Sequence, residues 1–196
     1  EKFANDLRAE DGKLKLDERG LPPKELESNV DLRGVAGNFW VGLGLLHTLF
    51  MHEHNAICDR LRREYPTWSD DDLYHHARLI NAAVMAKIHT VEWTPAMIAH
   101  RTTIKGMHAN WYGIVGERLT KRFGRIGRGE VLSGIPGSRT NHHGVPYSLT
   151  EEFVAVYRMH ALLPDEFTFR SATDDKFLAR PDFPQLGVLQ TRTRLA

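Results

Sequence analysis

The spacing of residues along the first long hydrophobic segment most limits what this chain can fold into. One stripe recurs there at steps of 3, 4, 4, 3 and 4 residues, and its members are Leu43, Leu46, Phe50, His54, Ile57 and Leu61. This is the period of one face of an α-helix. The pattern therefore predicts a long helix from Asn38 to Pro66 that buries this stripe.

Helical patterns continue beyond Pro66. Ser69 and Asp72 have the spacing of a capping box at the start of a second helix, which is predicted to run to about Pro95. A third helical piece is predicted over residues 96–111. No convincing apolar–polar alternation typical of strands is present, so the predicted fold class is mainly α.

The remaining segments complete a predicted single domain over residues 1–196. Residues 1–37 form a loop-rich lead-in, with a short hairpin expected near residues 13–20, and residues 38–112 form the helical core. Residues 113–146 are glycine-rich and basic, which favours an extended surface excursion. Residues 147–165 read as a short buried helix, and residues 166–196 as an irregular tail.

Tyr157 and His160 lie three residues apart in this short helix, between a capping box at Ser148 and Glu151 and a stop at Pro164. Residues at i and i+3 share a helical face, so both side chains can reach one pocket. Histidine is a common axial ligand of haem iron, and a tyrosine one turn away can exchange an electron with haem. The alternative is that both residues only pack, with their polar tips satisfied.

Two other groups of histidines have a possible chemical role. His52 and His54 are two residues apart, whereas helical zinc ligands need i and i+4, so a core His54 and a solvated His52 are expected instead of zinc. His89 and Thr94 are five residues apart, close to a helix end. An imidazole and a hydroxyl can together hold a carboxylate by hydrogen bonds, and the alternative is a capping threonine beside a core histidine.

Composition narrows the class of protein. The formal net charge of +1 gives no support for a nucleic-acid binder, and a single cysteine, Cys58, excludes an internal disulfide framework. No apolar run is long enough to span a bilayer, and the chain opens without a signal peptide. We expect a cytoplasmic or peripherally membrane-associated protein. Its basic, glycine-rich stretch KRFGRIGRGE, residues 121–130, is expected to be a solvated loop, and contact with anionic lipid headgroups is the alternative.

Several stretches resemble a known family. The run VYRMHALLPDEF resembles the proximal helix of the cyclooxygenase and α-dioxygenase branch of the animal-type haem peroxidase superfamily. The stretches KIHTVEWT, HANWYG and NHHGVPYSLTEEF are similar to α-dioxygenases in particular. The resemblance implies a haem-peroxidase-like, cyclooxygenase-type helical fold, of which this chain is an internal section.

The resemblance also implies a function, that of a haem-dependent fatty-acid α-dioxygenase. Tyr157 matches the radical tyrosine, His160 the axial ligand of haem b iron, and His89 and Thr94 the pair that binds the substrate carboxylate. The partners implied are a long-chain fatty acid and O2, with no specific protein partner. The distal histidine and the calcium site of the family match nothing in this chain. A haem peroxidase of small donors and a truncated, non-catalytic helical module are the alternatives.

Overall fold

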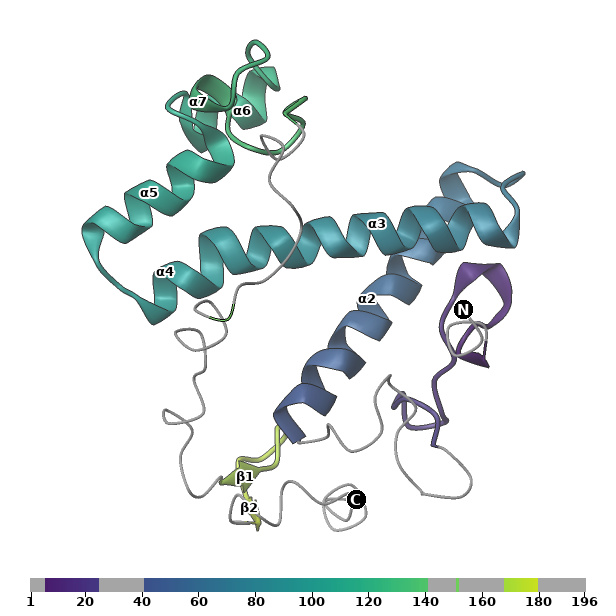
Figure 1. The fold of residues 1–196 in the computed structure, drawn as a ribbon. Coiled ribbons are helices and arrows are strands. Elements are labelled where there is room, and N and C mark those ends of the chain that lie inside the picture. The colour runs from purple at the N-terminus through teal and green to yellow at the C-terminus, as the bar shows by residue number, and fades with distance from the viewer. Residues whose placement is uncertain (1–5, 25–40, 141–150, 152–167, 180–196) are drawn as a thin grey trace. The chain divides into compact units, whose positions relative to one another are not determined.

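The structure, a computed structural model, describes residues 6–24, 41–140, 151 and 168–179 (Figure 1). The chain divides into two compact units, residues 1–81 with 150–196 and residues 82–149. Most described elements are helical, which confirms the mainly α class. The first unit contains the 3-10 turn η1 (Glu10–Gly12), α2 (Val41–Glu64), most of α3 (Asp70–Ile88) and the strands β1 (Phe169–Arg170) and β2 (Phe177–Ala179).

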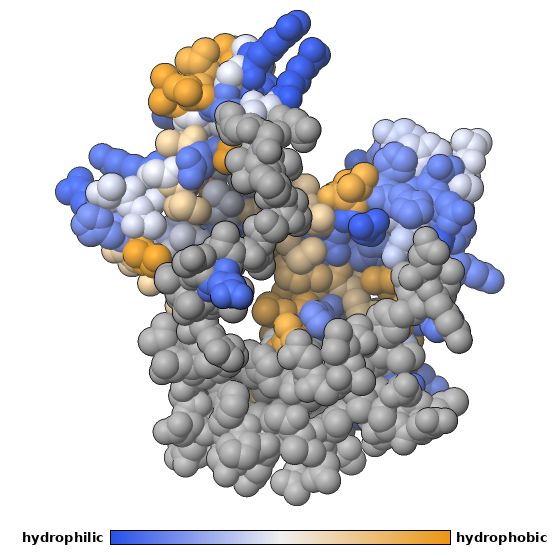
Figure 2. Space-filling view, in the orientation of Figure 1, coloured by the Kyte–Doolittle hydropathy of each residue, from blue (hydrophilic) through white to orange (hydrophobic). Residues whose placement is uncertain are grey.

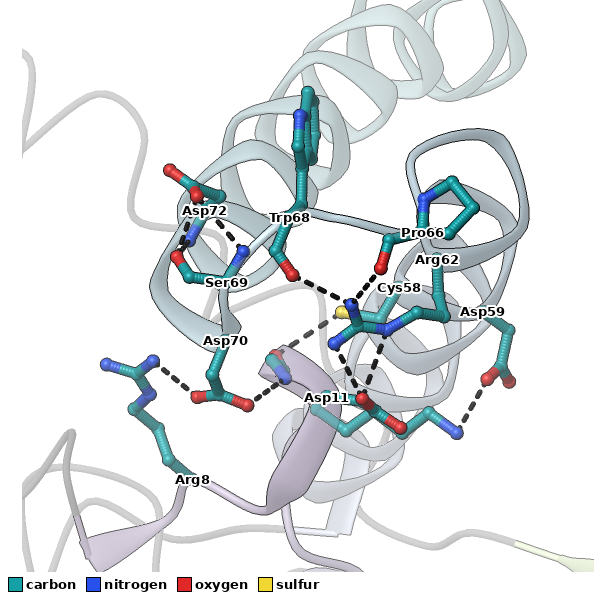
Figure 3. A network of polar contacts seen from close by, with 12 residues as sticks. Arg8, Asp11, Cys58, Asp59, Arg62, Pro66, Trp68, Ser69, Asp70 and Asp72 are labelled. Carbon is teal, nitrogen blue, oxygen red and sulfur yellow. Dashed lines mark hydrogen bonds and ion pairs between the residues drawn. The ribbon is translucent and has the colours of Figure 1, made fainter.

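The predicted capping box at the start of α3 is confirmed. The Ser69 amide donates to Asp72 Oδ2 at 3.1 Å, and the Asp72 amide donates to Ser69 Oγ at 3.2 Å (Figure 3). The Ser69 hydroxyl also donates to the Asp72 carboxylate, and this bond holds the pKa of Asp72 below its ordinary value. Two amides that lack a partner within the helix are thereby satisfied, which is why α3 begins here.

The buried face of α2 differs from the predicted stripe. Met51, His54 and Cys58 are the buried positions in the described part of α2, whereas Leu46 is 49% exposed. These three positions are spaced by three and four residues and so form one line along the helix. The prediction was correct about His54 and wrong about Leu46, and the remaining positions of the stripe are half-buried. Burial moves to the line of Cys58 and His54 because η1 packs there, from a direction that the local pattern does not reveal.

Gly12 is the centre of this packing. Its amide donates to Asp70 Oδ1 at 2.6 Å, and its carbonyl oxygen lies 2.9 Å from His54 Nε2 and 3.3 Å from Cys58 Sγ. Its φ of 71° lies in the left-handed region that glycine adopts at low cost. A Cβ atom at this position would lie 2.5 Å from the Tyr74 amide nitrogen, so the close approach of η1 to α3 requires glycine.

Ion pairs surround Gly12 at the surface. Arg62 binds Asp11 Oδ1 through both Nε, at 3.1 Å, and the terminal nitrogen Nη2, at 2.7 Å (Figure 3). Lys13 pairs with Asp59 at 2.6 Å, and Arg8 pairs with Asp70 at 2.8 Å. Exposed pairs of this kind contribute little individually, so they fix the orientation of η1 more than they stabilise the fold.

Short β pairing occurs where the pattern did not place it. Arg8 and Leu14 form an isolated antiparallel bridge around η1, which overlaps only the start of the hairpin expected at residues 13–20. In the predicted irregular tail, β1 pairs antiparallel with β2, with Phe169 opposite Ala179. Strands of two and three residues are too short to show a period-2 pattern, which is why they were missed.

We expect His54 to make the free energy of unfolding decrease as the pH falls below about 6.5. Burial lowers the pKa of His54 in the folded chain, and its hydrogen bond to Gly12 offsets this only in part. The unfolded chain therefore takes up a proton at a higher pH than the folded chain does, and protonation favours unfolding. Urea unfolding near pH 7.5 and near pH 5.5 measures the difference. His54→Gln, which keeps an N–H donor but does not titrate, should show a smaller decrease, and an equal decrease would contradict this expectation.

The second unit is built from the end of α3, the π-helical turn η2 (His89–Trp93), α4 (Thr94–Met97), α5 (Arg101–Tyr112), α6 (Gly116–Phe123) and α7 (Glu130–Ser133). The prediction of an extended excursion after residue 112 was wrong in its described part. The Ile114 amide donates to the Val131 carbonyl at 2.9 Å, and the Ile135 amide donates to the Asn110 carbonyl at 2.9 Å. Residues 110–135 therefore form a compact segment, the α6–α7 segment, which is held together by its own main-chain hydrogen bonds.

Two glycines permit the close main-chain contacts of the α6–α7 segment. A Cβ atom on Gly113 would lie 2.1 Å from the Leu132 carbonyl oxygen, and one on Gly134 would lie 2.0 Å from the Trp111 carbonyl oxygen. Both glycines have a φ near 70°, at 68° and 75°. The glycines that suggested an extended segment are thus needed for close contact between main chains. Among the described helices, none is both long and apolar enough to cross a membrane.

Candidate functional site

His89 and Thr94 lie on one turn of π-helix, at the junction of η2 and α4. The Thr94 amide donates to the His89 carbonyl, which is an i to i+5 hydrogen bond. Such a bond places residue i+5 one turn after residue i, so the two side chains share a face. In an α-helix, residues five apart would be separated by about 140° around the axis. The π turn therefore brings together the two residues predicted to hold a carboxylate.

Pro95 gives a physical reason for the wider turn. Proline has no N–H, and its ring collides with the carbonyl of residue i−4 in an α-helix, which here is Val91. Opening the helix by one residue removes this conflict and places Pro95 in the first turn of α4, where no amide donor is required. The predicted end of the second helix near Pro95 is thus a change of helix type, and the break comes after Met97.

The His89 imidazole is held by an aromatic neighbour. Its ring stacks on the Trp93 ring, with centroids 5.2 Å apart and planes inclined by 21°. The side chain is otherwise exposed in the described part of the chain. The predicted role of His89 therefore stays a prediction. Stacking restricts the orientation of the ring and so fixes the direction in which its nitrogens can bind a ligand.

Thr94 is half-buried, and its hydroxyl is already engaged. Thr94 Oγ1 donates to the His89 carbonyl oxygen at 2.7 Å, alongside the amide bond to the same oxygen. In this conformation the hydroxyl can only accept a further hydrogen bond. To donate to a carboxylate it must exchange the His89 carbonyl for the ligand.

Tyr157 and His160 lie outside the described residues, as do Ser148 and Pro164. Glu151 is described only as an exposed helical residue. The predicted roles of Tyr157 and His160, and the short helix that would carry them, therefore stay predictions.

His52 and His54, the pair two residues apart on α2, bond to two different main-chain carbonyls. His54 is 3% exposed and its Nε2 bonds to the Gly12 carbonyl, while the exposed His52 places Nε2 2.7 Å from the Gly20 carbonyl. Within the described residues, no group of three or more histidine, cysteine or acidic side chains could hold a metal ion.

Trp93 was not assigned a role from the sequence, which suggested only that it is a core residue. It is 38% exposed, and one of its faces packs on His89. The spacing of four residues between His89 and Trp93 is the available signal, since it places the two rings on neighbouring turns. The π turn had one signal as well, the proline that follows Thr94.

The chain is similar to animal haem peroxidases and, among them, to α-dioxygenases. The sequence profile described as animal haem peroxidase matches residues 1–190. An α-dioxygenase 1 of Capsicum annuum is 50% identical over 163 residues, which are 83% of this chain and 25% of that protein. A crystal structure of the Oryza sativa fatty acid α-dioxygenase is similar, with a TM-score of 0.87 and 42% identity over 95% of this chain and 32% of the other.

A further crystal structure, of a tyrosine-to-phenylalanine variant of the Oryza sativa enzyme with palmitic acid, gives a TM-score of 0.87 at 41% identity. It too covers 95% of this chain and 32% of the other. The similarity to α-dioxygenases expected from the sequence is thereby confirmed. The chain spans about a quarter to a third of the length of these relatives.

Proposed function

Because this chain belongs to the animal haem peroxidase family, we propose that it is a section of a haem-dependent fatty-acid α-dioxygenase. The alignment of His89 and Thr94 on one face of the π turn carries the proposal, since this pair suits a substrate with a terminal carboxylate. The similarity to a structure that contains palmitic acid supports a long-chain fatty acid as that substrate.

Each residue has one role in this proposal. His89 donates a hydrogen bond to the fatty-acid carboxylate, and Thr94 adds a second when its hydroxyl leaves the His89 carbonyl. Holding the carboxylate places the neighbouring carbon atom, and no carbon further along the chain, at the reactive group. Trp93 keeps the His89 ring in a single orientation.

His160 would hold the haem through its iron. The Nε2 atoms of His52 and His54 already bond to main-chain carbonyls, which favours His160 over both of them. Haem, when bound, would supply the one-electron oxidation that converts a tyrosine side chain into its phenoxyl radical.

The reaction proposed for Tyr157 has three steps. The phenoxyl oxygen takes a hydrogen atom from the carbon next to the carboxylate, which restores the phenol and leaves a carbon radical. O2 adds to that carbon and gives a peroxyl radical. The peroxyl radical takes the hydrogen atom back from Tyr157, so that a 2-hydroperoxy fatty acid is released and the tyrosyl radical is regenerated.

Oxygen uptake by the haem-loaded protein tests the whole proposal. Palmitic acid should consume one O2 per molecule and give the 2-hydroperoxy product, identified by mass spectrometry. Oxidation of a small phenolic donor by peroxide, without oxygen uptake on palmitic acid, would instead establish a haem peroxidase. Absence of a Soret band after reconstitution with haem would establish a module without a haem site.

We expect His160→Ala to weaken or abolish haem incorporation, because the imidazole supplies the bond from the protein to iron. Soret absorbance after reconstitution measures this. His75→Ala, which removes an exposed histidine of α3, is the matched control and should retain haem. Equal haem retention in the His160 variant and the wild type would remove His160 from this role.

We expect His89→Ala to weaken the apparent affinity for the fatty acid by roughly ten- to a hundredfold, since a hydrogen bond to a charged group contributes about 1.5–3 kcal/mol. Thr94→Val should have a smaller effect, because the hydroxyl must first give up the His89 carbonyl. Steady-state kinetics of oxygen uptake measure both variants, and the Soret band should not change in either.

The methyl ester of the same fatty acid separates a carboxylate anchor from a general packing role. The wild type should use the ester poorly, and the His89 variant should discriminate less between acid and ester. An unchanged preference in the variant would exclude His89 as the anchor, while the Soret band and oxygen uptake would still report the remainder of the proposal.

A further inference from the structure

The α6–α7 segment carries apolar and basic side chains together at its surface. Seven of its apolar residues are more than 40% exposed: Ile114, Leu119, Phe123, Ile126, Val131, Leu132 and Ile135. Figure 2 shows hydrophobic surface gathered over α6 and α7, next to strongly hydrophilic side chains. Large apolar residues are exposed on other elements as well, such as Leu79 at 65%, so the distinguishing feature of this segment is that its exposed apolar residues lie beside basic ones.

The charge of this segment stands out from the rest of the chain. Residues 113–140 contain six basic residues and two acidic ones, whereas the whole chain has a formal net charge of +1. Lys121 pairs with Glu117 at 2.7 Å, and Arg125 is bound by main-chain carbonyls that include Gly134 at 2.8 Å. Arg118 and Arg128 are exposed and form no ion pair within the described part of the chain. These positive charges are therefore available to a partner.

Helix α6 arranges the two kinds of residue in adjacent rows. Leu119 and Phe123 are four residues apart and form one row, and Arg118 and Arg122 form the next row about 100° away. The Arg122 guanidinium lies 5.4 Å from the Phe123 ring centroid, so the basic row folds against the apolar one. This division is typical of helices that lie in the interface of a membrane.

We propose that Ile114–Ile135, the α6–α7 patch, binds the surface of an anionic phospholipid bilayer. Apolar side chains would enter the headgroup region, and the arginines would contact lipid phosphates. A protein surface is a poorer match, because covering the patch would also remove the exposed arginines from water at considerable cost unless each met an acidic group. The α6–α7 segment has its own main-chain hydrogen bonds and can present the patch without rearrangement.

Co-sedimentation of the full chain with vesicles tests the proposal without any turnover, so its outcome is independent of the oxygenation chemistry. Phosphatidylcholine vesicles with about one-third phosphatidylserine should bind the protein, and pure phosphatidylcholine should bind it much more weakly. Salt should reduce the binding to the anionic vesicles. The double variant Arg118→Glu with Arg122→Glu should lower the partition coefficient by at least about twentyfold, since each basic residue contributes about fivefold.

A matched control exists on α3, where Arg78 is exposed and Leu79 is 65% exposed. Arg78→Glu with Leu79→Ser should bind vesicles as the wild type does, whereas Phe123→Ser with Val131→Ser should lose binding. Melting temperatures close to the wild-type value would show that all variants are folded. Equal binding to neutral and anionic vesicles, or an equal loss in the α3 control, would overturn the proposal.

An introduced fluorescent label gives a second measurement. The only cysteine of the chain, Cys58, is fully buried, and burial raises its pKa to about 11, so it does not compete for a thiol reagent. A polarity-sensitive dye on Val131→Cys should shift to shorter wavelength when anionic vesicles are added, and the same dye on Leu79→Cys should not. A short-wavelength emission at position 131 before vesicles are added would mean that protein already covers the patch, which would overturn the proposal.

Discussion

Tyr157→Phe is expected to abolish fatty-acid oxygenation while the protein keeps its fold and its haem. Phenylalanine preserves the ring and its packing, but without the phenolic oxygen it cannot form a phenoxyl radical. Hydrogen abstraction next to the carboxylate then has no acceptor in the proposed mechanism. Oxygen uptake with palmitic acid should fall to the background rate, while the Soret band stays at its wild-type position and intensity.

Tyr65→Phe is the control for this variant. Tyr65 is 46% exposed and stacks on Trp68 at 4.1 Å between ring centroids, so its hydroxyl has no part in the proposed site. The control should retain wild-type oxygen uptake. Near-normal uptake by the Tyr157 variant would require another residue to abstract the hydrogen atom, and would leave the proposed roles of His160 and His89 to be decided by their own tests.

Gly12→Ala should cause a large loss of stability, about 3–5 kcal/mol in the free energy of unfolding. The added methyl group would lie 2.5 Å from the Tyr74 amide nitrogen and 2.7 Å from Leu73 Cβ, so η1 would have to move away from α3. That movement would break the Gly12 bonds to Asp70, His54 and Cys58. Urea unfolding followed by circular dichroism measures the loss.

Gly116→Ala separates main-chain strain from collision. Gly116 also has a positive φ, of 80°, but a Cβ atom there would meet nothing within 4 Å. Its replacement should cost only about 1–2 kcal/mol, the strain of a left-handed conformation. If both variants lost the same stability, the packing of η1 on α3 would not be the reason that position 12 needs glycine.

Much of the secondary structure was predictable because its causes are local. The capping box of Ser69 and Asp72 depends on residues three positions apart, and the structure shows both of its hydrogen bonds. The position of His54 on the buried side of α2 followed from the helical period alone. Burial of Cys58 did not, because the thiol packs on the Gly12 carbonyl of η1, more than thirty residues upstream.

The candidate site likewise has one part that was predictable from the sequence and one part that was not. The residue types and their family resemblance pointed to His89 and Thr94, but α-helical spacing would have separated them around the axis. Pro95 lies next to the pair and favours the π turn, yet only the folded structure shows that the turn forms and that Trp93 stacks on His89. The predicted roles of Tyr157 and His160 rest on sequence similarity.

The sequence by itself determined the helical class, the start of α3 and the family, because each depends on residue types at short and regular spacing. Tertiary structure decided which face of α2 is buried and how the glycine-rich segment after Tyr112 folds. A Cβ atom on Gly113 or Gly134 would collide with main-chain atoms of residues 132 and 111, respectively. These contacts join residues far apart in the sequence, so no local pattern predicts them. A glycine in sequence signals conformational freedom, and only the contacts of the folded chain show whether that freedom serves a flexible loop or a close approach between main chains.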